Sequence, residues 1–507
     1  MKYTGDYSHT ENYSSALENK VKVEKQLLTE IENGRIKIVT SKPKIINAIG
    51  AIIKKDSNKE KTRIIMDCSA PANNSFNDLA TDTSVGYDDV RVVRENIKHG
   101  DFMCKVDASN AFRVINVAPE EQDLLGLKWT FSGNSEPTYM VDCCMSFGVA
   151  KGPQTYQKIS KAATRIMKKA GYNRVYAYLD DWIILESTFS KCLEAQSYLV
   201  TLLRRLGISI NYSKIEGPTR KITFLGVEID TNSYTLSIPQ EKLDSLKLKL
   251  INVRGHKSVS KKTLEALTGL LCWIAQVTPW GNQYLRYIYD RCNKMSKRHH
   301  KTRITKEIKE ELDWWMEAAN KFICVVPIKS QRSSFVSVAS DATLESLGAV
   351  VYDSIKSLWF YSDYKSWPLD VQDLPITYKE VLAVFPVFLT HAPSWRGKLI
   401  HLHMDNKPGV SILNKGTCKN LVVMRYLKII GILCKQFDII FKAFFYSGKD
   451  NFISDALSRI HLPGGVPRWK NVLLSLRGAT GDLPAGDKDP CWLDNVIHGF
   501  GGHRICL

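Results

Sequence analysis

Short apolar runs alternate with charged stretches along most of the chain, and their spacing changes several times. Residues 1–40 begin polar and then carry apolar side chains at helical spacing, ending at a helix stop, Gly34. Between residues 45 and 67, two apolar runs enclose the charged segment 54–62, which predicts a β-hairpin with a long turn. The apolar positions of the predicted helix are Val21, Val23, Leu27, Leu28 and Ile31.

The rest of the chain divides into a mixed, a helical and a second mixed region. Residues 100–235 alternate short apolar strands with helices, which is typical of an α+β domain. Residues 239–322 are mostly helical in pattern, and strands resume at Ser334 in a second mixed unit. The tail, 462–507, is rich in Gly, Pro and Asp and predicts no element.

The amino-acid composition, through its excess of basic residues, indicates that the protein binds a polyanion. A chain of 507 residues corresponds to about three or four domains at roughly 150 residues each. Lys and Arg number 70 against 52 Asp and Glu, for a net charge of +18. Such an excess favours nucleic acid as a partner. The alternative is a basic protein with dispersed surface lysines.

The cysteines and the N-terminus indicate an intracellular, soluble protein without a membrane span. None of the 12 cysteines forms a C-x-x-C pair, which argues against a zinc ribbon or a thioredoxin-like site. They are scattered through apolar stretches, as reduced thiols are. The polar N-terminus lacks a signal-peptide core, and no run approaches the roughly 18 apolar residues of a transmembrane helix.

A first set of carboxylates lies where apolar strands end. Two apolar runs, 174–179 and 182–185, meet at Asp180 and Asp181, and adjacent carboxylates near a core repel unless a cation neutralises them. Upstream, Asp107 ends another apolar strand and can complete a two-metal site for Mg²⁺. Alone, the Asp-Asp pair is better explained by an ordinary turn that contains two aspartates.

A second set of acids ends four different elements: Asp341, Glu380, Asp405 and Asp455. Each alone is better explained as a helix cap or a surface acid. Together they have the distribution of ligands that converge on metal ions.

In this order, the segments resemble the palm motifs of reverse transcriptases. Asp107 matches the first motif, and the later motifs follow in sequence. They are 146–148 with Pro153 for the second, 178–181 for the Y-x-D-D hairpin, 207–210 with Lys214 for the fourth, and 224–226 for the primer grip.

The resemblance implies further substrate contacts. Lys54, Lys55 and Arg63 would hold the triphosphate, and Phe112 would lie under the sugar and exclude a 2′-hydroxyl. A solvated basic turn and a core phenylalanine are the alternatives. The remaining residues implied in substrate binding are Phe147, Gly148, Tyr178 and Lys214; some relatives carry Gln where this chain has Phe147.

The second set of acids is similar to the ribonuclease H domain of retroelements. The resemblance implies that two Mg²⁺ ions activate water against the RNA strand of a hybrid, recognised by its 2′-hydroxyls and A-like shape. Many relatives carry a His shortly before the last acid, whereas residues 444–448 contain none here.

Several features are similar to DIRS-like retrotransposons, whose integration uses a separate tyrosine recombinase. These are the loop 69–71 leading to 75–78 and the short distance between the helical region and the ribonuclease H segment. Pararetroviruses and long-terminal-repeat elements share the main motifs. In the helical region, 286–303 suits a contact with the template-primer backbone, or else a solvated face. Its basic and aromatic residues are Arg286, Arg291, Lys294, Lys297, Arg298, Lys301, Arg303, Tyr287 and Tyr289.

We therefore expect an α+β multidomain protein: a right-hand polymerase followed by a ribonuclease H-like α/β domain. The expected parts are an N-terminal helical extension (1–40), fingers and palm (41–238), a helical thumb or connection (239–333), a ribonuclease H-like domain (334–460) and an unassigned tail (461–507).

The resemblance predicts an RNA-directed, and also DNA-templated, DNA polymerase with ribonuclease H activity. It implies two Mg²⁺ ions per active site, with Mn²⁺ as a substitute. The implied partners are an RNA template, a DNA primer, an RNA-DNA hybrid and deoxynucleoside triphosphates, besides a separately encoded tyrosine recombinase and a Gag-like protein. The location would be cytoplasmic, or nuclear if 297–301 is an import signal. The alternatives are a domesticated nucleic-acid-binding protein and an RNA-binding scaffold, but scaffolds do not need acids at strand ends.

Overall fold

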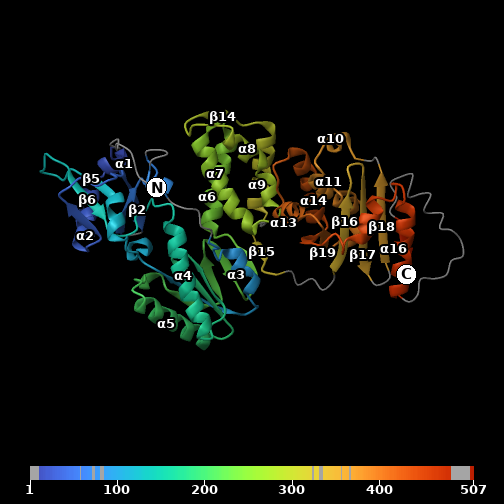
Figure 1. The fold of residues 1–507 in the computed structure, drawn as a ribbon, viewed down its shortest axis with the longest axis horizontal. Helices are drawn as coiled ribbons and strands as arrows, with labels where there is room; N and C mark the ends of the chain where they lie inside the picture. The colour runs from blue at the N-terminus through green and yellow to red at the C-terminus, as the bar shows by residue number, and fades with distance from the viewer. Residues whose placement is uncertain are drawn as a thin grey trace. The chain divides into compact units, whose positions relative to one another are not determined.

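The computed structural model describes residues 11–56, 59–70, 75–79, 85–321, 325–329, 335–354, 357–364, 367–480 and 503–506. The chain forms two compact units, Met1–Leu236 and Ser237–Leu507 (Figure 1). In the parts described, no helix combines the length and the apolar character that crossing a membrane would take. Nine cysteines of the described residues, from Cys68 to Cys434, are free thiols.

The N-terminal helix packs on a small sheet in the first unit. As predicted, it ends just before Gly34, whose φ is +69°. Val23 and Leu27 are fully buried, whereas Val21 is 78% exposed, so only part of the predicted apolar face meets the core. The elements are α1 (Ser14–Leu17), α2 (Lys20–Glu32) and the sheet β1-β6-β5 of Ile36–Val39, Thr138–Asp142 and Gly126–Trp129.

The predicted hairpin consists of β2 (Ile49–Asp56) and β3 (Lys59–Met66) in antiparallel register. The long charged turn expected over 54–62 is wrong, because Lys54 pairs with Lys61 and Ile53 with Thr62 inside the ladder. Backbone hydrogen bonds continue through charged positions when the strand faces are solvated. The turn itself, residues 57–58, lies outside the described residues.

The palm is the four-stranded antiparallel sheet β7-β8-β4-β9, with two long helices on one face. Val106 and Trp182, cross-strand partners, are completely buried under these helices. The strands are β4 (Phe102–Asp107), β7 (Val175–Tyr178), β8 (Asp181–Glu186) and β9 (Glu216–Thr219), and the helices are α4 (Gly152–Lys169) and α5 (Phe189–Arg205). Around them lie α3 (Val90–Asn96), β10 (Lys221–Phe224), β11 (Val227–Asp230), β12 (Thr235–Ser237) and the 3-10 turns Phe76–Leu79, Ala111–Val114, Pro119–Leu124 and Tyr212–Lys214.

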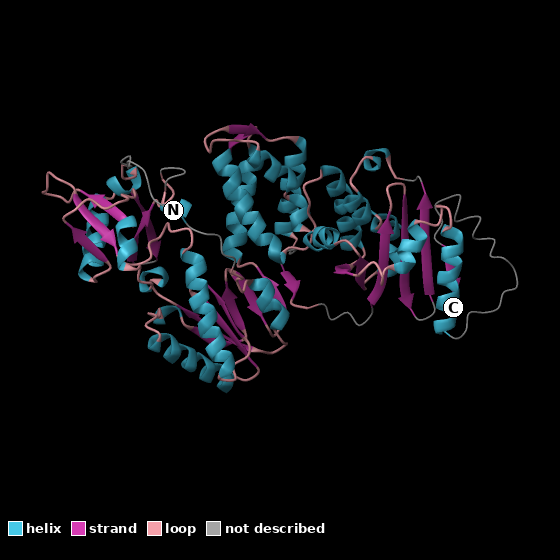
Figure 2. Cartoon of the chain, viewed as in Figure 1, coloured by secondary structure: helices cyan, strands magenta, loops and turns pink. Residues whose placement is uncertain are grey.

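The second unit begins with a helical region, as the leucine spacing predicted (Figure 2). Leu264, Leu267 and Leu271 lie on the buried side of one helix. The elements are α6 (Gln240–Gly255), β13 (Ser258–Ser260), α7 (Lys261–Ile274), the 3-10 turns Ala275–Val277 and Gly281–Tyr284, α8 (Arg286–Asn293), β14 (Lys301–Arg303), α9 (Lys306–Asn320) and β15 (Val325–Pro327).

A mixed six-stranded sheet follows, in the order β20-β19-β16-β17-β18-β21. β16, β17 and β18 are antiparallel neighbours, and β19 and β20 run parallel to β16. The strands are β16 (Phe335–Ala342), β17 (Ser346–Ser354), β18 (Ser357–Tyr364), β19 (Leu399–Met404), β20 (Ile440–Phe445) and β21 (His503–Cys506).

Helices cover both faces of this sheet (Figure 1). One face packs against α11 to α14 and part of the other against α15 and α16. The helices are α10 (Leu369–Gln372), α11 (Ile376–Leu382), α12 (Val384–His391), the 3-10 turn Ala392–Trp395, α13 (Lys407–Lys415), α14 (Leu421–Gln436), α15 (Phe452–Ser458) and α16 (Gly465–Thr480).

The helix α16 lies in the tail for which no element was expected. Its Trp469 is fully buried beside Leu457 and Ile460 of the α15 segment. Few apolar residues besides this Trp anchor the helix, so its sequence shows little periodicity.

The helical region packs directly on the mixed sheet domain within the second unit. Glu311 of α9 is completely buried, accepts hydrogen bonds from the backbone N–H groups of Tyr287 and Ile288, and lies 3.3 Å from Lys428 Nζ of α14. That ammonium also lies 5.0 Å from the ring centroid of Tyr284. The two regions therefore meet without an intervening domain.

Two candidate carboxylate sites

Three acids meet at one end of the palm sheet. Asp107, the last residue of β4, lies directly opposite Asp181, the first residue of β8. Asp180 occupies the turn between β7 and β8, and its carbonyl accepts a hydrogen bond from Ala108 N at 2.8 Å. The predicted strand-end acids are thus brought together by strand register.

The turn that carries Asp180 is held by two buried side chains of α4. Leu179 has a φ of +52°, which is unfavourable for a branched residue. Gln157 accepts from Leu179 N at 2.7 Å, and Ser160 Oγ donates to Leu179 O at 2.7 Å. Gln157 Nε2 also donates to Ala177 O at 2.9 Å. The sequence analysis missed this pair, although two polar residues three positions apart on a buried helix face were a usable signal.

The electrostatics of the palm site favour a bound cation. Burial, followed by repulsion from Asp180 and Asp107, raises the pKa of Asp181 to about 7. Burial also raises the pKa of Asp180. Lys214 Nζ, 3.3 Å from Asp107 Oδ2, is a nearby positive group. Clustered carboxylate oxygens are the hard donors that Mg²⁺ prefers, so the residues fit this ion.

A cavity of about 290 Å³ opens beside Asp107 and Asp180. Its lining includes Arg63, Phe112, Phe147 and Lys214, which were all expected to bind substrate, and Lys61, which was not. The ring centroids of Phe112 and Phe147 are 5.3 Å apart, and the Arg63 guanidinium lies 5.4 Å from the centre of the Phe147 ring. The cavity thus combines cationic groups with an aromatic wall.

Among the described residues, Lys54, Tyr178 and Gly148 were expected to bind substrate but are not part of this lining. Lys54 lies farther along β2, and the Lys55 side chain is outside the described residues. Tyr178 packs against Tyr87 at 5.3 Å between ring centroids.

Gly148, also expected to bind substrate, has a packing role in the structure. Its φ is +127°, and a Cβ there would lie 1.7 Å from Met66 O. This close approach allows Met66 N to donate to Phe147 O at 2.8 Å, which fixes the Phe147 segment beside the end of β3.

A buried ion-pair network lies at the wall of the cavity. Arg113 pairs with Asp142 at 2.6 Å and with Glu30 of α2 at 2.8 Å. Ser146 Oγ donates to Asp142. The N-terminal helix is thereby tied to the segment that follows Asp107, which the sequence analysis did not anticipate.

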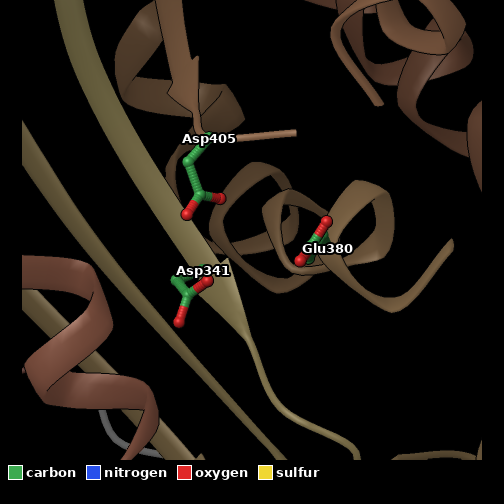
Figure 3. Close-up of side chains that lie close together, drawn as sticks. All are labelled: Asp341, Glu380 and Asp405. Atoms are coloured by element: carbon green, nitrogen blue, oxygen red, sulfur yellow. The ribbon is translucent and has the colours of Figure 1, made fainter. Parts of the chain in front are cut away.

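Three of the four predicted acids converge in the second unit. Carboxylate oxygens of Asp341, Glu380 and Asp405 lie within 4.8 Å of one another (Figure 3). They come from β16, α11 and the residue after β19. Burial first, and then the neighbouring acids, raise the pKa of Asp341 to about 6, although a hydrogen bond from Ser458 opposes the rise. Burial also raises the pKa of Glu380. This oxygen cluster fits a divalent cation such as Mg²⁺.

The fourth predicted acid does not join this group. Asp455 of α15 pairs with Arg459 at 2.8 Å and with Arg468 of α16. Its helix is nevertheless docked at the cluster, because Ser458 Oγ donates to Asp341 Oδ2 at 2.5 Å.

Some basic residues of the helical region pair with other side chains of the same region. Arg286 pairs with Asp290, Arg291 donates to Thr302, and Arg298 lies 3.1 Å from Glu265. The exposed cations of this segment are Lys294, Lys297, Arg298, Lys301 and Arg303.

The fold and its two acid clusters define the class. The chain has the right-hand polymerase fold, followed by a ribonuclease H-like α/β domain, as the sequence predicted. Residues 52–229 match the family model of the reverse transcriptase (RNA-dependent DNA polymerase). Over these residues the first unit is similar to that family.

Viral polyproteins are similar in sequence. The genome polyprotein of Petunia vein clearing virus (isolate Shepherd) is 21% identical over 331 residues, which cover 62% of this chain and 14% of that protein. Protein P of Woodchuck hepatitis B virus (isolate 2) is 25% identical over 134 residues, which cover 26% of this chain and 15% of the relative. The chain thus spans about a seventh of these relatives.

Solved structures share the fold. The foamy viral protease-reverse transcriptase dRH in complex with double-stranded DNA aligns with a TM-score of 0.53 and 14% identity, covering 87% of this chain and 71% of that one. The foamy viral protease-reverse transcriptase in complex with an RNA/DNA hybrid aligns with a TM-score of 0.52 and 15% identity, covering 96% and 57%. At such identities the likeness concerns the fold.

Proposed function

We propose that the chain is an RNA-directed DNA polymerase, also able to copy DNA, that carries a ribonuclease H activity. The observation that supports this most directly is the register of Asp107 opposite Asp181, which gathers three carboxylates beside a cationic, aromatic cavity. A nucleic-acid scaffold would gain nothing from acids there, because they repel phosphates.

In the polymerase site, Asp107, Asp180 and Asp181 would hold two Mg²⁺ ions, or Mn²⁺. Bound there, the metal ions lower the pKa of a primer 3′-hydroxyl and neutralise the triphosphate. Arg63 and Lys61 line the cavity and would bind the phosphate oxygens. Lys214 would stabilise negative charge next to Asp107.

Phe112 would discriminate against ribonucleotides. Its ring lines the cavity and is supported at its edge by Phe147 and Tyr156, with centroid distances of 5.3 and 6.0 Å. A ring fixed in this way leaves no room for a 2′-hydroxyl on a sugar packed against it.

In the second site, Asp341, Glu380 and Asp405 would hold the metal ions that activate water against the RNA strand of a hybrid. Ser458 and Asn406 would orient these acids, since Ser458 donates to Asp341 and Asn406 donates to Glu380. Asp455 would be the fourth ligand once its arginine pairs open.

The remaining assignments rest on the sequence resemblance. The RNA template, DNA primer, hybrid and deoxynucleoside triphosphates would be the substrates. A DIRS-like element would supply a tyrosine recombinase and a Gag-like protein as separate chains, and the work would take place inside the cell.

Primer extension on an RNA template tests the proposal. The native chain should extend a primer with deoxynucleotides and Mg²⁺, and Asp180→Asn/Asp181→Asn should not. Asp123→Asn, a half-exposed carboxylate paired with Lys44, is the matched control and should extend normally. Asp341→Asn should abolish degradation of the RNA strand and leave extension intact. A folded native chain that binds the hybrid but extends no primer would instead be a domesticated binding protein.

A further inference from the structure

One face of the ribonuclease H-like sheet carries a row of aromatic rings that the proposed function does not use. Side chains alternate along β16, β19 and β20, and Val336, Ile400 and Ala443 point into the core beneath α11 to α14. The opposite face of the same strands bears five rings, here called the ring row: Phe335, His401, His403, Phe444 and Tyr446.

The rings contact one another in an unbroken series. Phe335 stacks on His401 at 5.0 Å between centroids and an interplanar angle of 23°. The edge of His401 meets Phe444 at 5.1 Å. His403 stacks between Phe444, at 5.7 Å and 23°, and Tyr446, at 4.4 Å and 27°. The series crosses three strands and ends on two rings, Phe335 and Tyr446.

Both terminal rings are open to solvent, at 55% exposed for Phe335 and 42% for Tyr446. Among the described helices, α15 and α16 cover this face over β16, β17 and β18, including the positions near Ala339 and Val350. His403 Nδ1 has no hydrogen-bond partner among the described residues, so stacking holds this ring.

The surroundings of the ring row favour a polyanion with flat, apolar groups. Lys442 is exposed on the same face, with its ammonium 5.6 Å from the centre of the Phe444 ring. The row ends beside the acid cluster, because Tyr446 N donates to Met404 O at 2.9 Å and Asp405 is the next residue. Unpaired nucleobases offer a π-face at each residue, with phosphates at their edges.

We propose that the ring row is a stacking platform for the unpaired bases of single-stranded nucleic acid entering or leaving the Asp405 cluster. Phe335 and Tyr446 would each take a base on their exposed faces, and Lys442 would contact the backbone phosphates. That the strand is RNA rests on the proposed ribonuclease H function; stacking itself does not, because it tolerates any base.

The test is binding of a dye-labelled short oligouridylate to the full chain in EDTA, which prevents cleavage. Phe335→Ala/Tyr446→Ala should raise the dissociation constant about tenfold, as expected for lost base stacking. Phe445→Ala is the matched control: it is 45% exposed, neighbours Tyr446 and points to the opposite face, so binding should not change. Phe335→Leu/Tyr446→Leu retains apolar bulk and should bind as weakly as the Ala pair.

Photo-cross-linking separates this surface from other nucleic-acid sites. An oligouridylate containing 5-iodouracil should cross-link to peptides that contain His403 or Tyr446. Equal affinities of the Ala pair and Phe445→Ala, or cross-links found elsewhere alone, would overturn the proposal. So would a change of oligomeric state in the Ala pair with unchanged affinity, since the ring row would then be a protein contact. If the native chain failed to extend a primer, the polymerase proposal would be wrong. The cross-link result would still test the ring row as a stacking surface.

Discussion

Asp107 and Asp181 face each other as direct partners in the antiparallel ladder of β4 and β8. Like charges directly opposite in a sheet are destabilising. With Asp180 in the adjoining turn, the palm concentrates three acids at one sheet end, and burial raises the pKa of both Asp180 and Asp181. The arrangement costs stability until a cation binds, and this links metal binding to folding.

Asp181→Asn should therefore stabilise the chain in EDTA while abolishing the response to metal. Removing one of three repelling carboxylates should raise the free energy of unfolding by about 1 kcal/mol. Native protein should gain thermal stability on adding Mg²⁺, and the variant should gain much less. Thermal unfolding of the first unit, with and without Mg²⁺, measures both. A variant less stable than native protein in EDTA would contradict the repulsion.

Gln157→Ala should disable the polymerase without contacting substrate. The side chain is fully buried and makes one hydrogen bond to Leu179 in the Asp180 turn and one to Ala177 of β7, so its loss should cost about 1–3 kcal/mol and release the strained Leu179 backbone. We expect kcat for extension to fall more than tenfold, with little change in primer-template affinity. Ser197→Ala, a serine on the exposed side of α5, is the control. Unchanged kcat would show that the turn holds its shape unaided.

Gly148→Ala should destabilise the first unit strongly. Both the φ of +127° and the contact at 1.7 Å with Met66 O oppose a Cβ, and we expect a loss of about 3 kcal/mol or more. Gly133→Ala isolates the backbone part of this cost, because its φ is +93° but nothing lies within 4 Å of the added Cβ. Urea unfolding of both variants gives the difference. Equal losses would mean that the Met66 contact relaxes freely.

Phe112→Val should relax sugar selection. A smaller side chain opens space at the cavity wall, so the ratio of kcat/KM for dCTP over CTP should fall by at least about tenfold. The edge contacts to Phe147 and Tyr156 are lost as well, and a modest drop in stability should accompany the change. Single-nucleotide incorporation measures the ratio. A ratio that stays at the native value would mean that another residue excludes the 2′-hydroxyl.

Arg468→Ala should tighten divalent-ion binding at the second acid cluster. Arg468 of α16 pairs with Asp455, and its removal leaves Arg459 as the remaining arginine paired with this carboxylate, which lies near Asp341. Calorimetric titration with Mn²⁺ should show affinity at this site increased several-fold, and the gain should disappear in Asp455→Asn. Lys470→Ala, an exposed residue of the same helix, should behave as the native chain. Unaltered Mn²⁺ affinity would mean that Asp455 is not a ligand.

Local pattern determined where the principal strands and helices lie and which of them end in acids. The strand over 399–404 and the helix ending before Gly34 follow from apolar spacing of two and of about 3.6 residues, which neighbours along the chain specify by themselves. The order of the motifs then predicted the fold class. The charged positions of β2 and β3 were not predicted as strand, because their backbone hydrogen bonds form whether the side chains are polar or apolar.

Only the tertiary structure decided which side chains meet. Arg113 finds Glu30 across 83 positions of sequence, and Gln157 reaches the Asp180 turn from another element. Asp455 belongs to the same predicted set of four acids as Asp341, yet it pairs with Arg468. This arginine lies on α16, a helix that the sequence pattern did not predict. Such pairings depend on strand register and helix docking, which are set by the packing of whole elements. The spacing of apolar residues along the chain does not specify these pairings.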